Sequence, residues 1–184
     1  MGDPAAVKPG ARESVGDLSE AAIVVDVGGG NGALLAALLQ RYPTLSGLLF
    51  DQDEVVAGAG DTLAAMAGRV QVVGGSFFDR VPAGGDVYLL SQVLHDWDDQ
   101  ACRQILAAVR SAMEPGRRLM VIERLLEPGS GPLHYLSDIN MMVNLHGRER
   151  SLDEFTQLLS ETGFGAPTVV RTQATFSILD ALSV

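Results

Sequence analysis

Residues 24–39 read VVDVGGGNGALLAALL, and this stretch decides how the rest of the chain is interpreted. An apolar run of strand length breaks into a loop of four glycines and an asparagine, then resumes with the spacing of a helix. Open α/β sheets bind their ligands where a strand, a loop and a helix follow one another in this way. The stretch therefore predicts a ligand-binding loop at one edge of a parallel sheet.

Segments of strand length alternate with helical segments along the rest of the chain. The expected strands are 21–27, 45–51, 69–75, 86–94 and 117–126. The expected helices are 32–42, 54–67, 99–113, 132–147 and 151–164. Two more strand-like stretches within 167–181 predict a terminal antiparallel hairpin. Repeated βαβ units imply a doubly wound α/β fold with a mostly parallel sheet and helices on both of its faces.

The composition is that of one globular domain in 184 residues, with 47% apolar and 20% charged residues. Residues 1–20 are rich in Gly, Pro and Ala, and they predict a linker before a domain over 21–184. A net charge of -10 without a basic run argues against a nucleic-acid partner. The sequence shows no signal peptide and no membrane-length apolar run, and its one cysteine needs no oxidising compartment, so we expect a cytoplasmic location.

The glycine loop is compatible with two adenosine cofactors. Gly28, Gly30 and Ala33 satisfy the G-x-G-x-x-A fingerprint of NAD-binding proteins. Asp26 and Gly32 extend the pattern to D-x-G-x-G-x-G, which resembles the first motif of class I S-adenosylmethionine-dependent methyltransferases. A cofactor without a pyrophosphate needs no helix N-terminus aimed at phosphate, but it needs backbone without Cβ atoms and an acid near its cationic groups. Glycines that only make a tight turn stay an alternative.

The stretch SQVLHDWDDQ, residues 91–100, separates these interpretations. Together with VVDVGGGNG, FDQD, IERLLEPG and GRERS, it resembles the plant caffeate and flavonoid O-methyltransferases and their bacterial counterparts in polyketide and phenazine tailoring. The resemblance covers residues from about 23 to 182. It implies a Rossmann-like, seven-stranded domain that uses S-adenosyl-L-methionine to methylate a hydroxyl of a small aromatic metabolite. An NAD-dependent oxidoreductase and a non-catalytic cofactor-binding remnant stay open as alternatives.

His95 is the candidate general base. A phenol with a pKa of ~10 is a poor nucleophile at neutral pH, whereas an imidazole with a pKa of ~6.5 is mostly neutral there and can take the phenolic proton. The resemblance implies that Glu123 and Glu149 assist His95, as the third member of a catalytic triad does. The residues alone leave open that Glu123 pairs with Arg124 or Arg150, and that Glu149 belongs to a charge cluster at a helix start.

The remaining candidates concern the cofactor and the acceptor. Asp51 ends the second expected strand, where an acid can bind ribose hydroxyls. The resemblance adds further cofactor contacts at Ser76, Phe77, Ser91 and Trp97, and acceptor contacts at Asp96, Met141 and Asn144. Many relatives have Asp and Met where this chain has Ser76 and Phe77, and core packing is the alternative for Phe77 and for the methionine stripe. No Cys/His cluster has metal-ligand spacing, which argues against a magnesium-dependent catechol-type enzyme.

The resemblance also includes a departure at the N-terminus. Members of this family usually carry a helical N-terminal domain that dimerises and closes the acceptor pocket, whereas a short segment precedes the first expected strand here. We therefore expect a catalytic domain alone, a small-molecule acceptor as partner, and a homodimer if the full-length protein has such a domain. Without it, incomplete exclusion of water and incomplete positioning of the acceptor would slow turnover.

Overall fold

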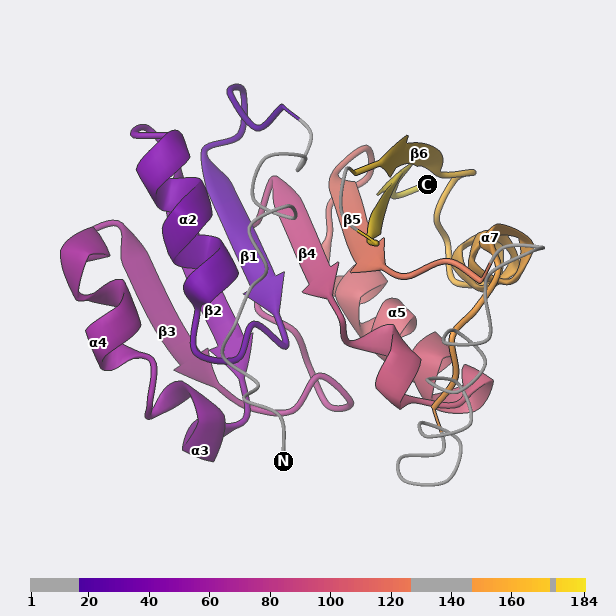
Figure 1. The fold of residues 1–184 in the computed structure, drawn as a ribbon, viewed down its shortest axis with the longest axis horizontal. Coiled ribbons are helices and arrows are strands. Elements are labelled where there is room, and N and C mark those ends of the chain that lie inside the picture. Colours follow the sequence, from indigo (N-terminus) through magenta and orange to yellow (C-terminus); the bar gives the residue numbers. More distant parts are fainter. Residues whose placement is uncertain (1–16, 127–146, 173–174) are drawn as a thin grey trace.

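The sheet is the centre of the fold in the computed structural model, which describes residues 17–126, 147–172 and 175–184. Its seven strands have the order β3-β2-β1-β4-β5-β7-β6 (Figure 1). Their bounds are β1 (Ile23–Val27), β2 (Ser46–Asp51), β3 (Val70–Gly74), β4 (Val87–Ser91), β5 (Arg118–Glu123), β6 (Thr168–Arg171) and β7 (Ser177–Leu182). Strands β1 to β5 pair in parallel, and β7 lies antiparallel between β5 and β6. The predicted parallel sheet with a terminal antiparallel hairpin is confirmed.

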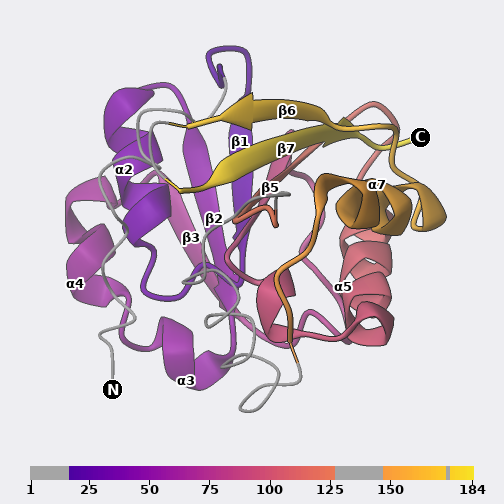
Figure 2. The same cartoon turned by 45° about the vertical axis from the view of Figure 1, so that its right-hand side comes forward.

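Helices cover both faces of this sheet, as the sequence predicts (Figures 1 and 2). The helices are α2 (Ala33–Arg41), α3 (Asp53–Val56), α4 (Gly60–Leu63), α5 (Asp99–Ala112) and α7 (Leu152–Glu161), with short 3-10 turns η1 (Ala64–Met66) and η2 (Leu94–Asp96). Two consecutive residues of β4 show the two layers: Leu89 packs in the core under α2, and Leu90 packs in the core under α5 and α7. A strand buried on both faces is nearly all apolar for this reason.

Two expected elements differ in the structure. The helix expected over 54–67 is divided into α3, α4 and η1, and Gly58 separates the first two pieces. Glycine costs ~1 kcal/mol relative to alanine in a helix, so a break there is favourable. The strand expected over 86–94 ends at Ser91, because the left-handed backbone of Gln92 (φ 55°) turns the chain out of the sheet. The helix expected over 132–147 lies almost wholly outside the described residues, and so do residues 1–16 of the expected linker.

Two well-capped helices position the segments that precede them. The side chain of Asp98 accepts a hydrogen bond from the Ala101 N–H at 2.8 Å and begins α5 just after the HDW turn. Ser151 and Glu154 form a reciprocal capping box that begins α7 just after Glu149. The caps thus hold the two segments that bring His95 and Glu149 to the sheet edge. Among the described residues, none of the helices has the length and apolar character needed to cross a bilayer.

Candidate active site

The candidate residues gather where the parallel strands end. β1 and β4 are neighbours in the sheet although they are distant in sequence, so the strand order reverses between them. Such a switch point opens a crevice at the carboxyl ends of the strands. Asp51 ends β2, Ser91 ends β4 opposite Ile122, and Glu123 ends β5. The structure thus brings together side chains whose sequence positions are up to 72 residues apart, 123 − 51, at one edge.

The glycine loop connects β1 to α2 in a conformation that needs glycine. Gly28, Gly30 and Gly32 have φ angles of 69°, 60° and 78°, in the left-handed region that other residues rarely adopt. The Gly30 N–H donates to Asp51 Oδ2 at 2.8 Å, and the second oxygen of Asp51 accepts from the Gln52 N–H at 2.7 Å. Asp51 therefore fixes the loop to the end of β2. Each carboxylate oxygen can accept more than one hydrogen bond, so Asp51 retains acceptor capacity for a ligand.

Asp26 lies beneath this loop and is 0% exposed. Neither of its carboxylate oxygens has a hydrogen-bond partner among the described residues. A Cβ added at Gly29 would lie 2.6 Å from Asp26 Oδ2, so the loop backbone covers the carboxyl group directly. Burial, with the negative charge of Asp51, raises the pKa of Asp26 to about 7. The structure thus places Asp26 directly beneath the loop that the sequence predicts to hold the cofactor.

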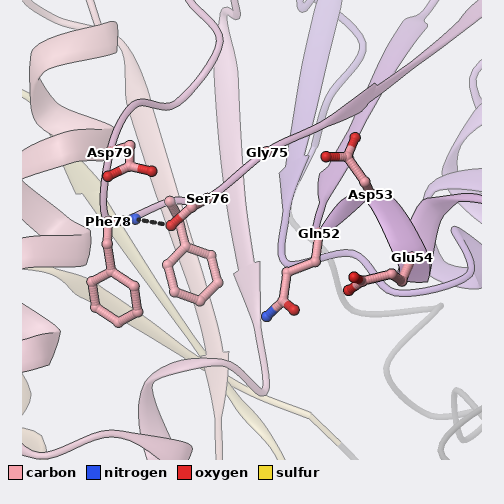
Figure 3. A pocket seen from close by; sticks show the side chains of 8 residues that line it. Gln52, Asp53, Glu54, Gly75, Ser76, Phe78 and Asp79 are labelled. Atoms are coloured by element: carbon pink, nitrogen blue, oxygen red, sulfur yellow. Dashed lines mark hydrogen bonds between the residues drawn. The ribbon is translucent and has the colours of Figure 1, made fainter.

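A cavity of about 430 Å³ opens between the end of β2 and the loop after β3 (Figure 3). Its lining residues are Gln52, Asp53, Glu54, Gly75, Ser76, Phe77, Phe78 and Asp79. Ser76 Oγ accepts a hydrogen bond from the Phe78 N–H at 3.2 Å. The Trp97 ring meets Phe77 and Phe78 edge-on at centroid distances of 6.0 and 4.8 Å. The volume suits a small organic ligand, and the lining includes Ser76 and Phe77, two of the cofactor contacts that the resemblance implies.

His95 lies in turn η2, directly after β4, with a carboxylate beside each ring nitrogen. Its Nδ1 is 2.9 Å from Glu123 Oε2, and its Nε2 is 3.2 Å from Asp96 Oδ1. Glu123 is 2% exposed, and its Oε1 also accepts from the backbone N–H groups of Leu94 and His95 at 2.9 and 3.3 Å. Glu123 therefore positions both the ring and the turn. Within the described residues Glu123 pairs with His95 rather than with Arg124 or Arg150, the alternative that the sequence left open.

The pKa of His95 is raised above its ordinary value of 6.5 by these contacts. Burial alone lowers the pKa, but the hydrogen bond that the His95 Nδ1–H donates to Glu123, together with the negative charges of Glu123 and Asp96, outweighs burial. A donor at Nδ1 leaves Nε2 as the nitrogen that accepts a proton. His95 is therefore a stronger base than a free imidazole.

A second cavity, of about 90 Å³, adjoins His95 and is lined by Gln92, His95, Glu123, Arg124, Glu149 and Phe176. Glu149 is buried, and Arg124 Nη1 lies 3.9 Å from its Oε1. The same guanidinium lies over the Phe176 ring, 5.2 Å from its centroid. The three predicted catalytic residues thus line one small cavity.

Sequence reasoning missed three residues of this cavity. Gln92 and Arg124 directly follow β4 and β5, and strand-end position is the signal that could have found them. Phe176 reaches the cavity because β7 pairs with β5, and Ser177 stands opposite Glu123. Of the predicted acceptor contacts, Asp96 lies at His95, while Met141 and Asn144 fall outside the described residues. In the part of the chain that the structure describes, no three His, Cys, Asp or Glu residues are grouped to hold a metal ion.

Comparisons with known proteins identify the family of this chain. The sequence matches the O-methyltransferase domain family over residues 12–165. The chain belongs to this family. It is 45% identical over 183 residues to O-demethylpuromycin-O-methyltransferase of Streptomyces alboniger, and the matched region covers 95% of this chain and 48% of that relative. It is 48% identical over 159 residues to 3-amino-4-hydroxybenzoate 4-O-methyltransferase of Streptomyces cremeus, covering 84% of this chain and 44% of the relative.

Solved structures of the O-methyltransferase family share the fold. The mitomycin 7-O-methyltransferase MmcR superposes with a TM-score of 0.90 at 35% identity, over 95% of this chain and 52% of MmcR. Human N-acetylserotonin methyltransferase, solved in complex with SAM, gives a TM-score of 0.83 at 33% identity, over 91% of this chain and 49% of the human protein. The predicted resemblance to small-molecule O-methyltransferases is confirmed. The chain spans about half the length of the relatives it matches.

Proposed function

We propose that this O-methyltransferase domain transfers a methyl group from S-adenosyl-L-methionine to a hydroxyl of a small aromatic metabolite. The observation that carries the proposal is the arrangement at His95, where Glu123 holds Nδ1 and Glu149 borders the same cavity. Relatives support the acceptor class: NcsB1 was solved with SAM and 2-hydroxy-5-methyl naphthoic acid. The family match argues against the alternative of an NAD-dependent oxidoreductase.

The residues at the switch point fit a cationic adenosine cofactor. Asp26 is a buried carboxyl group without a hydrogen-bond partner among the described residues, and the loop backbone is open at Gly30, where an added Cβ would meet nothing within 4 Å. Asp51 would bind ribose hydroxyls, and Ser76 and Phe77 would border the adenine. Bound S-adenosyl-L-methionine would supply a methyl group on a sulfonium sulfur. The sulfonium and ammonium charges would lie near two acids, which favours their binding.

His95 would act on the acceptor as a general base. Its Nε2 takes the proton of the hydroxyl group, and the electron pair of the broken O–H bond stays on the oxygen. The resulting imidazolium is stabilised by Glu123 at 2.9 Å, because the negative charge favours the protonated ring. General base catalysis of this kind contributes ~10²–10⁴-fold to the rate. The proposed partner is the small-molecule acceptor. A homodimer, if the full-length protein has an N-terminal dimerisation domain, stays a prediction, and so does a cytoplasmic location.

The test separates cofactor binding from methyl transfer. Isothermal titration with S-adenosyl-L-methionine and a fluorescence titration with NADH identify the cofactor, and we expect binding of the first alone. A panel of hydroxybenzoates, hydroxynaphthoates and hydroxyphenazines with methyl-labelled cofactor then identifies the acceptor class. The His95→Gln variant serves as a control that binds cofactor but transfers methyl slowly. NADH binding would contradict the cofactor assignment, and cofactor binding without any labelled product would favour a non-catalytic domain.

A further inference from the structure

The turn that carries His95 makes only weak hydrogen bonds of its own. Within η2 and its flanks, the Asp96 N–H reaches Val93 O and the Trp97 N–H reaches Leu94 O, both at 3.3 Å. These distances exceed the usual range for N–H···O bonds. Glu123 supplies acceptors for the N–H groups at the start of the turn. A catalytic ring on such a turn needs a matching donor for the carbonyl groups.

Arg150 is the charged donor to these carbonyl groups, beside the weaker contacts of the Cys102 thiol at 3.2 Å from Leu94 O and 3.6 Å from Trp97 O. Its side chain is 0% exposed, its Nη1 donates to Leu94 O at 2.8 Å, and its Nη2 donates to Trp97 O at 2.7 Å. Asp99 balances the charge, since its Oδ1 accepts from Arg150 Nε at 3.0 Å and from Nη2 at 2.9 Å. The planar guanidinium fork thus joins the carbonyl groups on either side of His95 to the first residue of α5.

The backbone beside Arg150 touches the same turn. A Cβ at Gly147 would lie 1.9 Å from the His95 carbonyl oxygen, so the chain approaches as closely as only glycine permits. The Leu126 N–H donates to Arg150 O at 2.9 Å, which anchors this segment behind β5. Glu149, between these contacts, borders the cavity at His95. Fixing Arg150 therefore fixes the relative position of two proposed catalytic side chains.

We propose that Arg150 is a positioning residue, which orients His95 toward the acceptor by holding the carbonyl groups of Leu94 and Trp97 while Glu123 holds the N–H groups. The proposal rests on the proposed function of His95 as base. Burying a full positive charge is costly unless the charge is paired and hydrogen-bonded. Here two of the hydrogen bonds of Arg150 go to the carbonyl groups of the turn that carries His95. A purely structural arginine would stabilise the fold without setting the ring's contact with Glu123.

The Arg150→Lys variant separates these roles. Lysine keeps the positive charge but lacks the fork that reaches both carbonyl groups, so the turn relaxes while the electrostatic field at His95 changes little. A misplacement of about 1 Å can cost ~10²-fold in rate, and we expect a fall in kcat of that order with unchanged cofactor affinity. NMR titration should show the pKa of His95 falling toward ~6.5 as the contact with Glu123 loosens. His95→Gln assigns its signal among the three histidines of the chain.

Arg148→Lys is the matched control. The Arg148 side chain also bonds Asp99, at 3.0 Å, but it is 38% exposed, and its bonds within the described residues are to the carboxylates of Asp99 and Glu154. We expect wild-type kcat and an unchanged pKa of His95 in this variant. If Arg150→Lys does not fold, Asp99→Asn takes its place, because Asp99 is 39% exposed and asparagine keeps an acceptor oxygen for Arg150. It should lower the pKa of His95 in the same direction by a smaller amount.

Two results would overturn the positioning role. A folded Arg150→Lys protein with the kcat and the His95 pKa of the wild type would show that the fork does not orient the ring. A lower melting temperature with an unchanged His95 pKa would show a structural role alone, for either variant. The NMR titration requires no acceptor. If the wild-type protein methylates nothing, the proposed function fails, and the titration still decides whether Arg150 positions His95.

Discussion

Asp26→Asn should remove most of the pH dependence of stability that the buried carboxyl group creates. Asp26 is fully buried, and its pKa is raised from 3.8 to about 7 by desolvation and by the charge of Asp51. The folded state therefore holds a proton that the unfolded state releases. The stability linked to this proton is fully present below pH 3.8 and is lost as the pH rises through about 7.

The magnitude follows from the size of the shift. Raising the pKa from 3.8 to about 7 is a change of about 3 units, and each unit corresponds to ~1.36 kcal/mol, which gives about 4 kcal/mol in total. Integrated between pH 5 and pH 8 alone, the loss of stability from Asp26 is about 2–3 kcal/mol. Asparagine keeps the shape of the side chain but does not titrate, so the variant should lack this component.

Urea denaturation at pH 5 and pH 8 measures the effect. From pH 5 to pH 8, the free energy of unfolding of the wild type should fall by about 2–3 kcal/mol more than that of Asp26→Asn. The variant therefore gains stability relative to the wild type at pH 8. Asp61→Asn, at an exposed acid of α4, is the control and should follow the wild type. Saturating S-adenosyl-L-methionine should flatten the wild-type curve, because a cationic ligand near the loop lowers the pKa of Asp26. Parallel curves for wild type and Asp26→Asn would refute the reasoning.

The other predictions concern the reaction and the cofactor. His95→Gln should lower kcat by ~10²–10⁴-fold while calorimetry shows intact cofactor binding, and full activity would exclude the general base. Asp96→Asn should lower the pKa of His95, and because the base must be neutral, activity should then rise at a lower pH than in the wild type; an unmoved kcat–pH profile would exclude this charge effect. Glu123→Gln should lower both kcat and the pKa of His95, as an NMR titration can show. Asp51→Ala should weaken cofactor binding, and unchanged affinity by calorimetry would remove Asp51 from the site.

Local patterns predict much of this fold because they reflect strong physical constraints. Strands buried on both faces appear in the sequence as apolar runs, and a glycine-rich loop between a strand and a helix predicts a ligand-binding loop at the sheet edge. The helical apolar spacing over 54–67 predicts one helix, although Gly58 lies within it and the structure has three short pieces there. His95, Glu123 and Glu149 were found through a family resemblance, and their convergence depends on β4 and β5 being neighbours.

Arg150 and Phe176 show why other parts of the site could not be predicted. Arg150 bonds the carbonyl groups of Leu94 and Trp97, and backbone acceptors leave no trace in a sequence pattern. Phe176 reaches the cavity through the insertion of β7 between β5 and β6, which is a property of strand order. Both contacts join parts of the chain that are more than 50 residues apart, 150 − 94 for Arg150 and Leu94.

The carboxylates beside His95 affect both its strength as a base and the access of the acceptor to its ring. The carboxylates at both ring nitrogens raise its pKa, so it binds a proton more strongly but is neutral in a smaller fraction of molecules near pH 7. In the proposed reaction Nε2 binds the acceptor hydroxyl, yet Asp96 Oδ1 lies 3.2 Å from that atom. Glu123 is 2% exposed and fixed by backbone donors, whereas the Asp96 side chain is 39% exposed. Asp96 is therefore the carboxylate that must yield to the acceptor, and once the hydroxyl replaces it, Glu123 is the remaining carboxylate that raises the pKa of His95 against burial and the charge of Arg124.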